Sequence, residues 1–128
     1  MRSDKENLIV ELSFQFALKI VAFSENLERD KKYVIARQLI KSGTSIGANV
    51  RESQNAESKA DFIHKLKIAA KEADETEYWL LICQESDSYP NTEDLRSELT
   101  SIIKVLSKII ATSKRAKSSN LLISKSSN

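Results

Sequence analysis

Apolar residues recur every three or four positions along most of this chain, which is the spacing of amphipathic helices. The pattern predicts helices at about 5–27, 31–54, 59–87 and 93–117. The last has the clearest stripe, made of Leu95, Leu99, Ile102, Leu106 and Ile109. Polar breaks separate the helices, and one of them contains Pro90, the only proline. Four helices with short connections predict an all-α fold, an antiparallel up-and-down four-helix bundle.

Three helix starts carry capping signals. Asp30 is predicted to cap the second helix, because its carboxylate can accept from an unpaired amide of the first turn. Ser58 with Asp61 forms a loose capping box before the third helix. Thr92 precedes the acidic first turn of the fourth helix, which suits the positive end of a helix dipole.

The first helix is apolar on more than one face. One stripe contains Leu8, Ile9, Leu12, Phe16, Ile20 and Phe23. A second set extends the apolar surface around the helix and contains Val10, Phe14, Ala17, Leu18 and Val21. Such a helix needs more than one partner face. Contacts with further copies of the chain satisfy that need, and so does a central position in the bundle.

The second helix combines small residues with a polar stripe. Gly43 and Gly47 lie four residues apart on one face, and each costs about 1 kcal/mol relative to alanine in a helix. A close approach of another helix is the expected compensation. Beside them runs a polar stripe made of Ser42, Ser45, Asn49 and Glu52.

Composition favours a single soluble helical domain. The 128 residues include only two glycines, and the net charge is +2. We expect a bundle domain at 1–117 and a disordered, serine-rich tail at 118–128. The first residues do not form a signal peptide, and no apolar run approaches the roughly 20 residues that span a bilayer. The single Cys83 suits a reducing compartment. We therefore expect a cytoplasmic protein without a membrane partner.

The residues of catalytic and metal sites are sparse. His64 is the only histidine, and no Glu-x-x-His pair exists, so a di-iron bundle site is not expected. Cys83 has no second cysteine with which to hold zinc. We expect no metal, no cofactor and no enzymatic activity.

One acidic group offers an alternative to that expectation. If the polar stripe of the second helix meets the third helix, Asn49 and Glu52 would approach Glu72 or Glu75. Paired carboxylates suit acid–base work or a divalent cation, and they would make a metal-dependent hydrolase. The favoured interpretation is a structural polar network that fixes helix register, with Arg51 as a further member. Its predicted residues are Ser42, Ser45, Asn49, Glu52, Glu72 and Glu75.

Basic side chains concentrate in two segments. Residues 31–56 hold five basic and one acidic side chain, and residues 91–128 hold seven and three. These segments suit nucleic-acid phosphates, although neighbouring helices of opposite charge would also produce this alternation. The candidate nucleic-acid contacts are Lys31, Lys32, Arg37, Lys41, Lys104, Lys108, Lys114, Arg115 and Lys117.

Two segments resemble a known family. QLIKSGTSIGANVRES, followed by SKADFIHKLKIAAKEADETEYWL, is similar to the bacterial 23S ribosomal RNA intervening-sequence proteins. The resemblance covers about residues 8–115 and rests on a Ser-x-x-Ser-x-x-x-Asn-x-x-Glu spacing. It implies an antiparallel four-helix bundle that forms a ring-like homopentamer without known enzymatic activity. A related accessory protein of diversity-generating retroelements binds nucleic acid and a reverse transcriptase.

Residues and resemblance together give one expected function and one alternative. The expected function is a non-enzymatic homo-oligomer that binds RNA or DNA through basic helix faces. The alternative is a scaffold or accessory subunit whose partner is another protein.

Overall fold

The computed structural model describes the backbone of residues 3–126 and the side chains of residues 3–116. Four helices fill this part of the chain, and it contains no strand. They are α1 (Asp4–Arg29), α2 (Tyr33–Ser53), α3 (Lys59–Glu85) and α4 (Glu93–Ser126). The predicted all-α class with four helices is therefore confirmed. The first three helices begin and end within two residues of their predicted bounds.

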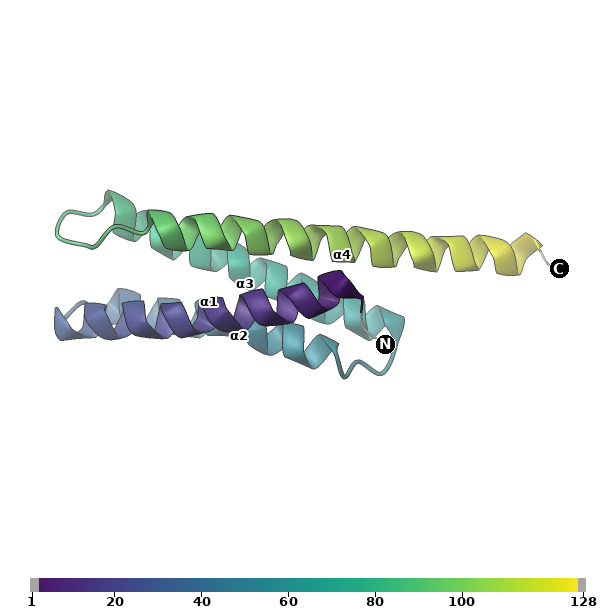
Figure 1. The fold of residues 1–128 in the computed structure, drawn as a ribbon, viewed down its shortest axis with the longest axis horizontal. Coiled ribbons are helices and arrows are strands. Elements are labelled where there is room, and N and C mark those ends of the chain that lie inside the picture. The colour runs from purple at the N-terminus through teal and green to yellow at the C-terminus, as the bar shows by residue number, and fades with distance from the viewer. Residues whose placement is uncertain (1–2, 127–128) are drawn as a thin grey trace.

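Short turns connect the helices at alternate ends of the structure. The α1–α2 and α3–α4 turns lie at the left of Figure 1, and the α2–α3 turn lies at the right. Each helix contacts two neighbours, in the order α1, α2, α3, α4 and back to α1. Within the described residues the backbones of the diagonal pairs α1–α3 and α2–α4 do not approach each other, and of the neighbouring pairs α1 and α4 approach least. The two predicted basic segments therefore lie on diagonally opposite helices.

The last helix is longer than expected. α4 continues past Lys117, its predicted end, to Ser126, and it extends beyond the other three helices (Figure 1). Side chains from residue 117 onwards lie outside the described part. The predicted disorder of 118–128 stays a prediction.

The core is a continuous apolar cluster to which all four helices contribute. Its largest fully buried side chains include Phe16 and Ile20 of α1, Leu39 of α2, Leu66 of α3 and Leu106 of α4. The predicted stripe of α4 lies in the core as expected. In α1, Ile9 takes the inward position, and the predicted core residue Leu8 is 46% exposed. That prediction was wrong because two adjacent residues of a helix point about 100° apart.

The predicted cap is present at the start of α3 and absent at the start of α2. Ser3 caps α1 through a reciprocal capping box with Glu6, and Ser58 caps α3 by accepting from the Asp61 amide at 3.0 Å. Asp30, however, is the C-terminal cap of α1 and does not cap α2. Lys31 follows in the left-handed region with φ 63°, so the turn takes two residues more than predicted and α2 starts at Tyr33.

Thr92 ties the α3–α4 turn to the preceding helix. Its side chain is 1% exposed, and its hydroxyl donates to the Leu80 carbonyl at 2.9 Å. The Thr92 amide donates to Oε1 of Gln84 at 2.8 Å. These bonds satisfy a buried polar side chain and fix where α4 begins.

The glycines of α2 face α1 of the same chain. A Cβ at Gly43 would lie 2.8 Å from Cγ2 of Ile20, and one at Gly47 would lie 3.3 Å from the Ser13 carbonyl oxygen. The close approach predicted from their spacing is therefore present, with α1 as the partner. Intramolecular packing accounts for both glycines, so they are not an argument for contacts between copies.

α1 is the most apolar segment of the bundle. An 18-residue window of it has a mean hydropathy of 1.4, so by length and composition alone this helix could cross a membrane. The expectation that no segment reaches this level was therefore too strict. Core helices pass the same test, and here Ile9, Phe16 and Ile20 are buried against the other helices. Its outward side nevertheless exposes Phe14 by 57% and Leu18 by 50%.

We predict that Gly43→Ala destabilises the fold. Steric overlap with Ile20 costs about 1–3 kcal/mol, and the better helix propensity of alanine returns about 1 kcal/mol. Chemical denaturation should show a net loss of about 1 kcal/mol. In the Ile20→Ala background the Cγ atoms are absent, so the same substitution should become neutral or stabilising. A stabilising effect in the unaltered background would show that the glycine is not sterically required.

Candidate functional site

The centre of the predicted polar network is a buried hydroxyl pair between α2 and α3. Ser42 and Thr76 are both fully buried, and Oγ1 of Thr76 donates to Oγ of Ser42 at 2.9 Å. Ser42 in turn donates to the Gln38 carbonyl at 3.0 Å. Each hydroxyl is therefore satisfied, and the pair links two helices across an otherwise apolar contact.

Thr76 was missed in the sequence-based prediction, although a signal for it exists. It lies between Ala73 and Leu80 at the three- and four-residue spacing of the inward stripe. A threonine at a core position needs a polar partner, and Ser42 was the nearest candidate on the facing helix.

The outer members of the predicted stripe form local bonds within their own helix. Ser45 donates to the Lys41 carbonyl at 2.5 Å, and Nδ2 of Asn49 donates to the Ser45 carbonyl at 2.9 Å. Glu52 forms an ion pair across the interface with Lys65 of α3, with Nζ and Oε2 3.3 Å apart. Lys65 is thus the partner of Glu52, where Glu72 or Glu75 was the expected neighbour.

Arg51 belongs to a different face of α2. It is exposed and lines the outer groove between α1 and α2, whereas Ser42 lies in the core. Nine residues separate them, which is two and a half helical turns, so they point to opposite sides. The prediction that Arg51 joins the Ser42 network was wrong for this reason.

Glu72 and Glu75 lie together on α3. Partial burial raises the pKa of Glu72, the adjacent Glu75 charge raises it further, and Lys41 of α2 partly opposes the shift. Glu52 is not among the groups that affect it. In the part of the chain whose side chains are described, no group of three or more His, Cys, Asp or Glu residues is placed to hold a metal ion. Glu72 and Glu75 are thus two neighbouring carboxylates on α3, away from Glu52.

The remaining reactive side chains are separated from one another. His64 is exposed on α3, and Cys83 is buried in the core, where burial raises its thiol pKa to about 11. A thiol with that pKa is a poor nucleophile at neutral pH.

The basic residues of α2 are partly neutralised by their neighbours. Lys32 forms an ion pair with Asp30 at 2.5 Å, and its ammonium lies 5.0 Å from the centre of the Tyr89 ring. Lys41 is exposed, but its charge acts on Glu72. Lys31 and Arg37 are exposed without an ion pair among the described side chains.

The basic residues of α4 have fewer acidic neighbours. Lys104, Lys108, Lys114 and Arg115 are all exposed, and the Arg115 guanidinium contacts Thr112. The side chain of Lys117 lies outside the described residues. From Leu99 to the last residue the sequence contains six basic residues and no acidic one. The sequence-based prediction also omitted Lys67 of α3, whose pKa is lowered by Lys114.

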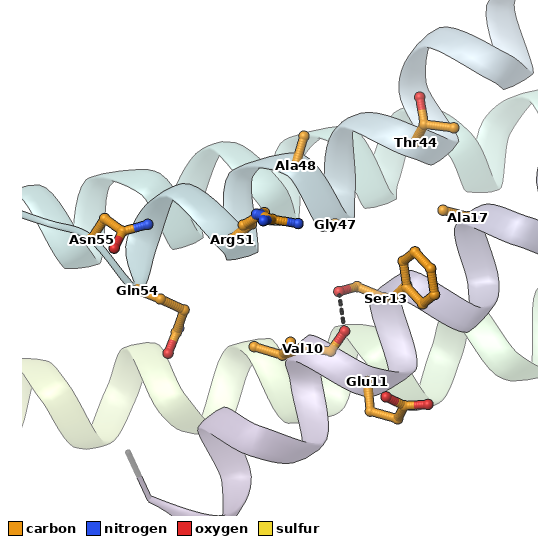
Figure 2. A pocket seen from close by; sticks show the side chains of 11 residues that line it. Val10, Glu11, Ser13, Ala17, Thr44, Gly47, Ala48, Arg51, Gln54 and Asn55 are labelled. Carbon is orange, nitrogen blue, oxygen red and sulfur yellow. Dashed lines mark hydrogen bonds between the residues drawn. The ribbon is translucent and has the colours of Figure 1, made fainter. Parts of the chain in front are cut away.

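A groove of about 560 Å³ lies on the surface between α1 and α2. Val10, Phe14 and Ala17 of α1 and Gly47 and Ala48 of α2 give it an apolar floor. Figure 2 shows Gln54 reaching from α2 toward α1, near the end of the groove where Arg51 and Asn55 lie. The apolar strip that the sequence indicated on α1 thus forms one wall of an open groove.

We predict that Glu72→Gln stabilises the protein at neutral pH. Because the pKa of Glu72 in the folded state lies above its ordinary value of 4.5, ionisation is less favourable in the folded protein than in the unfolded chain. The resulting penalty is absent below about pH 4.5 and develops as the pH rises through the folded pKa. Thermal unfolding should show a higher Tm for the variant at pH 7 and equal Tm values at pH 4. The exposed Glu77→Gln is the control, and an identical gain there would contradict this assignment.

A solved structure closely matches this fold. It is the crystal structure of a protein of unknown function from the S23 ribosomal protein family of Bacteroides thetaiotaomicron. The two chains are 43% identical with a TM-score of 0.80, and the match covers 84% of this chain and 98% of the other. A search among curated proteins gave no match.

The family assignment agrees with the resemblance seen in the sequence. The match to the family spans all of α2 and α3, including the Ser42–Thr76 pair and the Glu72 neighbourhood. The 23S rRNA-intervening sequence protein family matches residues 5–109, and the chain therefore belongs to that family.

Proposed function

We propose that this protein is a non-enzymatic, ring-like homopentamer of antiparallel up-and-down bundles that binds RNA or DNA through the basic surface of α4. It acts without a cofactor in the bacterial cytoplasm. The observation that carries the proposal is the charge of α4, which has no acidic residue after Glu98. The family description refers to 23S rRNA, which supports RNA as the polyanion.

The apolar groove between α1 and α2 supports the assembly. Phe14 and Leu18 are about half exposed, and burying such side chains contributes about 1.5–3 kcal/mol each. Ala48 is a small side chain on the opposite wall and leaves room for another element to approach. If a second copy covers this groove, the apolar side chains that are exposed in a single copy become buried.

We predict that Phe14→Glu dissociates the oligomer without unfolding the bundle. The side chain points outward in a single copy, so the charge disturbs only a contact between copies. Light scattering should change from five times the chain mass to the mass of one chain, while circular dichroism stays helical. Phe14→Leu keeps the apolar surface and should leave the assembly unchanged. An unmodified protein that is a stable monomer at micromolar concentration would refute the assembly.

The basic surface of α4 is better suited to nucleic acid than that of α2. Lys104 and Lys108 lie one turn apart on its outward face, and Arg115 continues the same face two turns later. On α2, Lys32 and Lys41 have acidic neighbours, and α2 lies diagonally across the bundle. We therefore assign the nucleic-acid surface to α4 and leave the basic residues of α2 out of it. A closed ring would repeat the α4 surface and raise the effective concentration of weak contacts.

We predict salt-dependent binding to duplex RNA or DNA. Phosphate contacts release counterions, so the affinity falls as the salt concentration rises. Fluorescence anisotropy in 50 and 200 mM salt should show a decrease of at least about tenfold. The double variant Lys104→Ala/Lys108→Ala should bind more weakly than the unmodified protein, and Arg37→Ala should not. The absence of binding to either duplex at 50 mM salt would refute this function.

The groove also supports a second candidate function, a scaffold for another polypeptide. Oε1 of Gln54 is buried without a donor among the described residues, and Arg51 at the same end has no ion pair there. A protein helix could supply both a donor and a carboxylate. Co-purification of a defined protein that survives nuclease treatment, and that Ala48→Arg abolishes, would favour the scaffold.

A further inference from the structure

A second apolar patch lies on the outward side of α3. Tyr78 is 61% exposed and Leu81, three residues later on the same side of the helix, is 41% exposed. Thr76, Leu80 and Cys83 are buried, so they hold the opposite side of this stretch of α3 in the core. Tyr78 and Leu81, here called the α3 patch, are therefore apolar surface that a single folded chain does not cover.

The α3 patch and the α1–α2 groove lie on different sides of the bundle. α1 and α3 are diagonal helices whose backbones do not approach each other in the described residues, so their outward sides face away from each other. The groove is lined by residues of α1, α2 and the turn that follows α2. One copy therefore cannot cover its own groove with its own α3 patch, whereas two copies can join groove to patch. Such a heterologous contact leaves one groove and one patch available for further copies until a ring closes.

The charges beside these two surfaces are opposite in sign. From Glu72 to Glu85, the second half of α3 contains five acidic residues and no basic one. α2 contains three basic residues, and its one acid, Glu52, is paired with Lys65. Arg51 lines the groove and forms no ion pair among the described side chains. An acidic helix that enters the groove thus meets an available guanidinium at its edge, and such complementarity selects the partner surface and its orientation.

The walls of the groove suit a bulky side chain. Ala17 of α1 and Ala48 of α2 are small, and the exposed Phe14 lies beside Ala17 on the same wall. Tyr78 offers a large ring with one polar tip, which is the kind of side chain enriched in protein interfaces. Glu11, the one acidic residue of the lining, belongs to the α1 wall. The acidic side of α3 is therefore expected to lie nearer the α2 wall.

We propose that the α1–α2 groove of one copy holds the α3 patch of the next copy. The assignment rests on the proposed function, because it names the two surfaces that form the contact between copies in the ring. In this contact Tyr78 and Leu81 cover Phe14, and the acidic side of α3 faces Arg51. The basic side of α2 then serves assembly, and the basic surface of α4 takes no part in the contact.

Blocking each surface separately tests the assignment. Tyr78→Lys should dissociate the assembly, because it places an ammonium group in an apolar groove beside Arg51. Tyr78 is exposed in a single copy, so circular dichroism should stay helical while light scattering reports the mass of one chain. Tyr78→Phe keeps the ring and should keep the assembly. If Phe14→Glu dissociates the assembly and Tyr78→Lys does not, the α3 patch is overturned as the partner surface and the proposed ring still stands.

Mixing the two monomeric variants tests whether the groove and the patch contact each other. Phe14→Glu retains an intact α3 patch and Tyr78→Lys retains an intact groove, so together they can rebuild one contact but not a ring. Sedimentation should show a dimer with one copy of each variant, and neither variant alone should form it. No dimer at up to about 1 mM of each, where even a millimolar Kd gives partial association, would overturn the proposal. An unmodified protein that is a monomer would overturn both this contact and the proposed assembly.

Trp79 reports on the α3 patch independently of mass. It is the one tryptophan of the chain, and its ring meets the Tyr78 ring edge-on, with the two centroids 5.6 Å apart. Its fluorescence emission should change when the two variants are mixed, because a neighbouring copy then covers the patch. Arg51→Glu in the groove-bearing copy should weaken the dimer several-fold at low salt, and Arg51→Lys should retain it. A dimer that forms without any change in Trp79 emission would place the contact elsewhere and overturn the proposal.

Discussion

The close approach of α1 and α2 is the constraint on which the rest of the bundle depends. Gly43 and Gly47 remove two side chains from α2, and the space is filled by Ile20 and by the backbone at Ser13. Two helical glycines cost about 1 kcal/mol each, so the contact must return that energy through packing. It also fixes which face of α1 is buried. The inward face completes the core, and the face with Phe14 and Leu18 is left at the surface. The α1–α2 contact therefore accounts both for the close packing of these two helices and for the apolar face that α1 leaves exposed.

The α2–α3 contact is organised by polar groups. A single buried hydroxyl pair, Ser42–Thr76, lies inside the interface, and the Glu52–Lys65 ion pair closes its outer edge. In another register each hydroxyl would still have a carbonyl partner in its own helix, Gln38 for Ser42 and Glu72 for Thr76. The bond between the two hydroxyls is therefore a modest preference for the observed alignment, worth about 0.5–1.5 kcal/mol. Glu72 and Glu75 repel each other at the same surface, which is a local cost carried by the family-matched segment.

The sequence was sufficient for the four helices, for their approximate ends except that of α4, and for most of the core, because these follow from local spacing and from capping by Ser58. It was insufficient wherever the partner of a residue had to be known. Glycine spacing predicted a close approach but could not identify α1 as the partner. Asp30 has a side chain typical of an N-cap, yet the turn took two more residues, with Lys31 in the left-handed region. Arg51 and Ser42 seemed neighbours in a polar run, and helical geometry directs them to opposite sides.

The order of contacts around the bundle has a consequence for how the chain folds. α1–α2, α2–α3 and α3–α4 are each neighbours along the chain, and only the loose α1–α4 contact joins distant segments. Helical bundles dominated by such local contacts have low contact order and fold in microseconds to milliseconds. The α1–α2 hairpin is able to form before α3 and α4 are available, which shields the most apolar helix on one side early. Its other side keeps Phe14 and Leu18 exposed after the single chain has folded, so folding alone does not remove the apolar surface that favours aggregation.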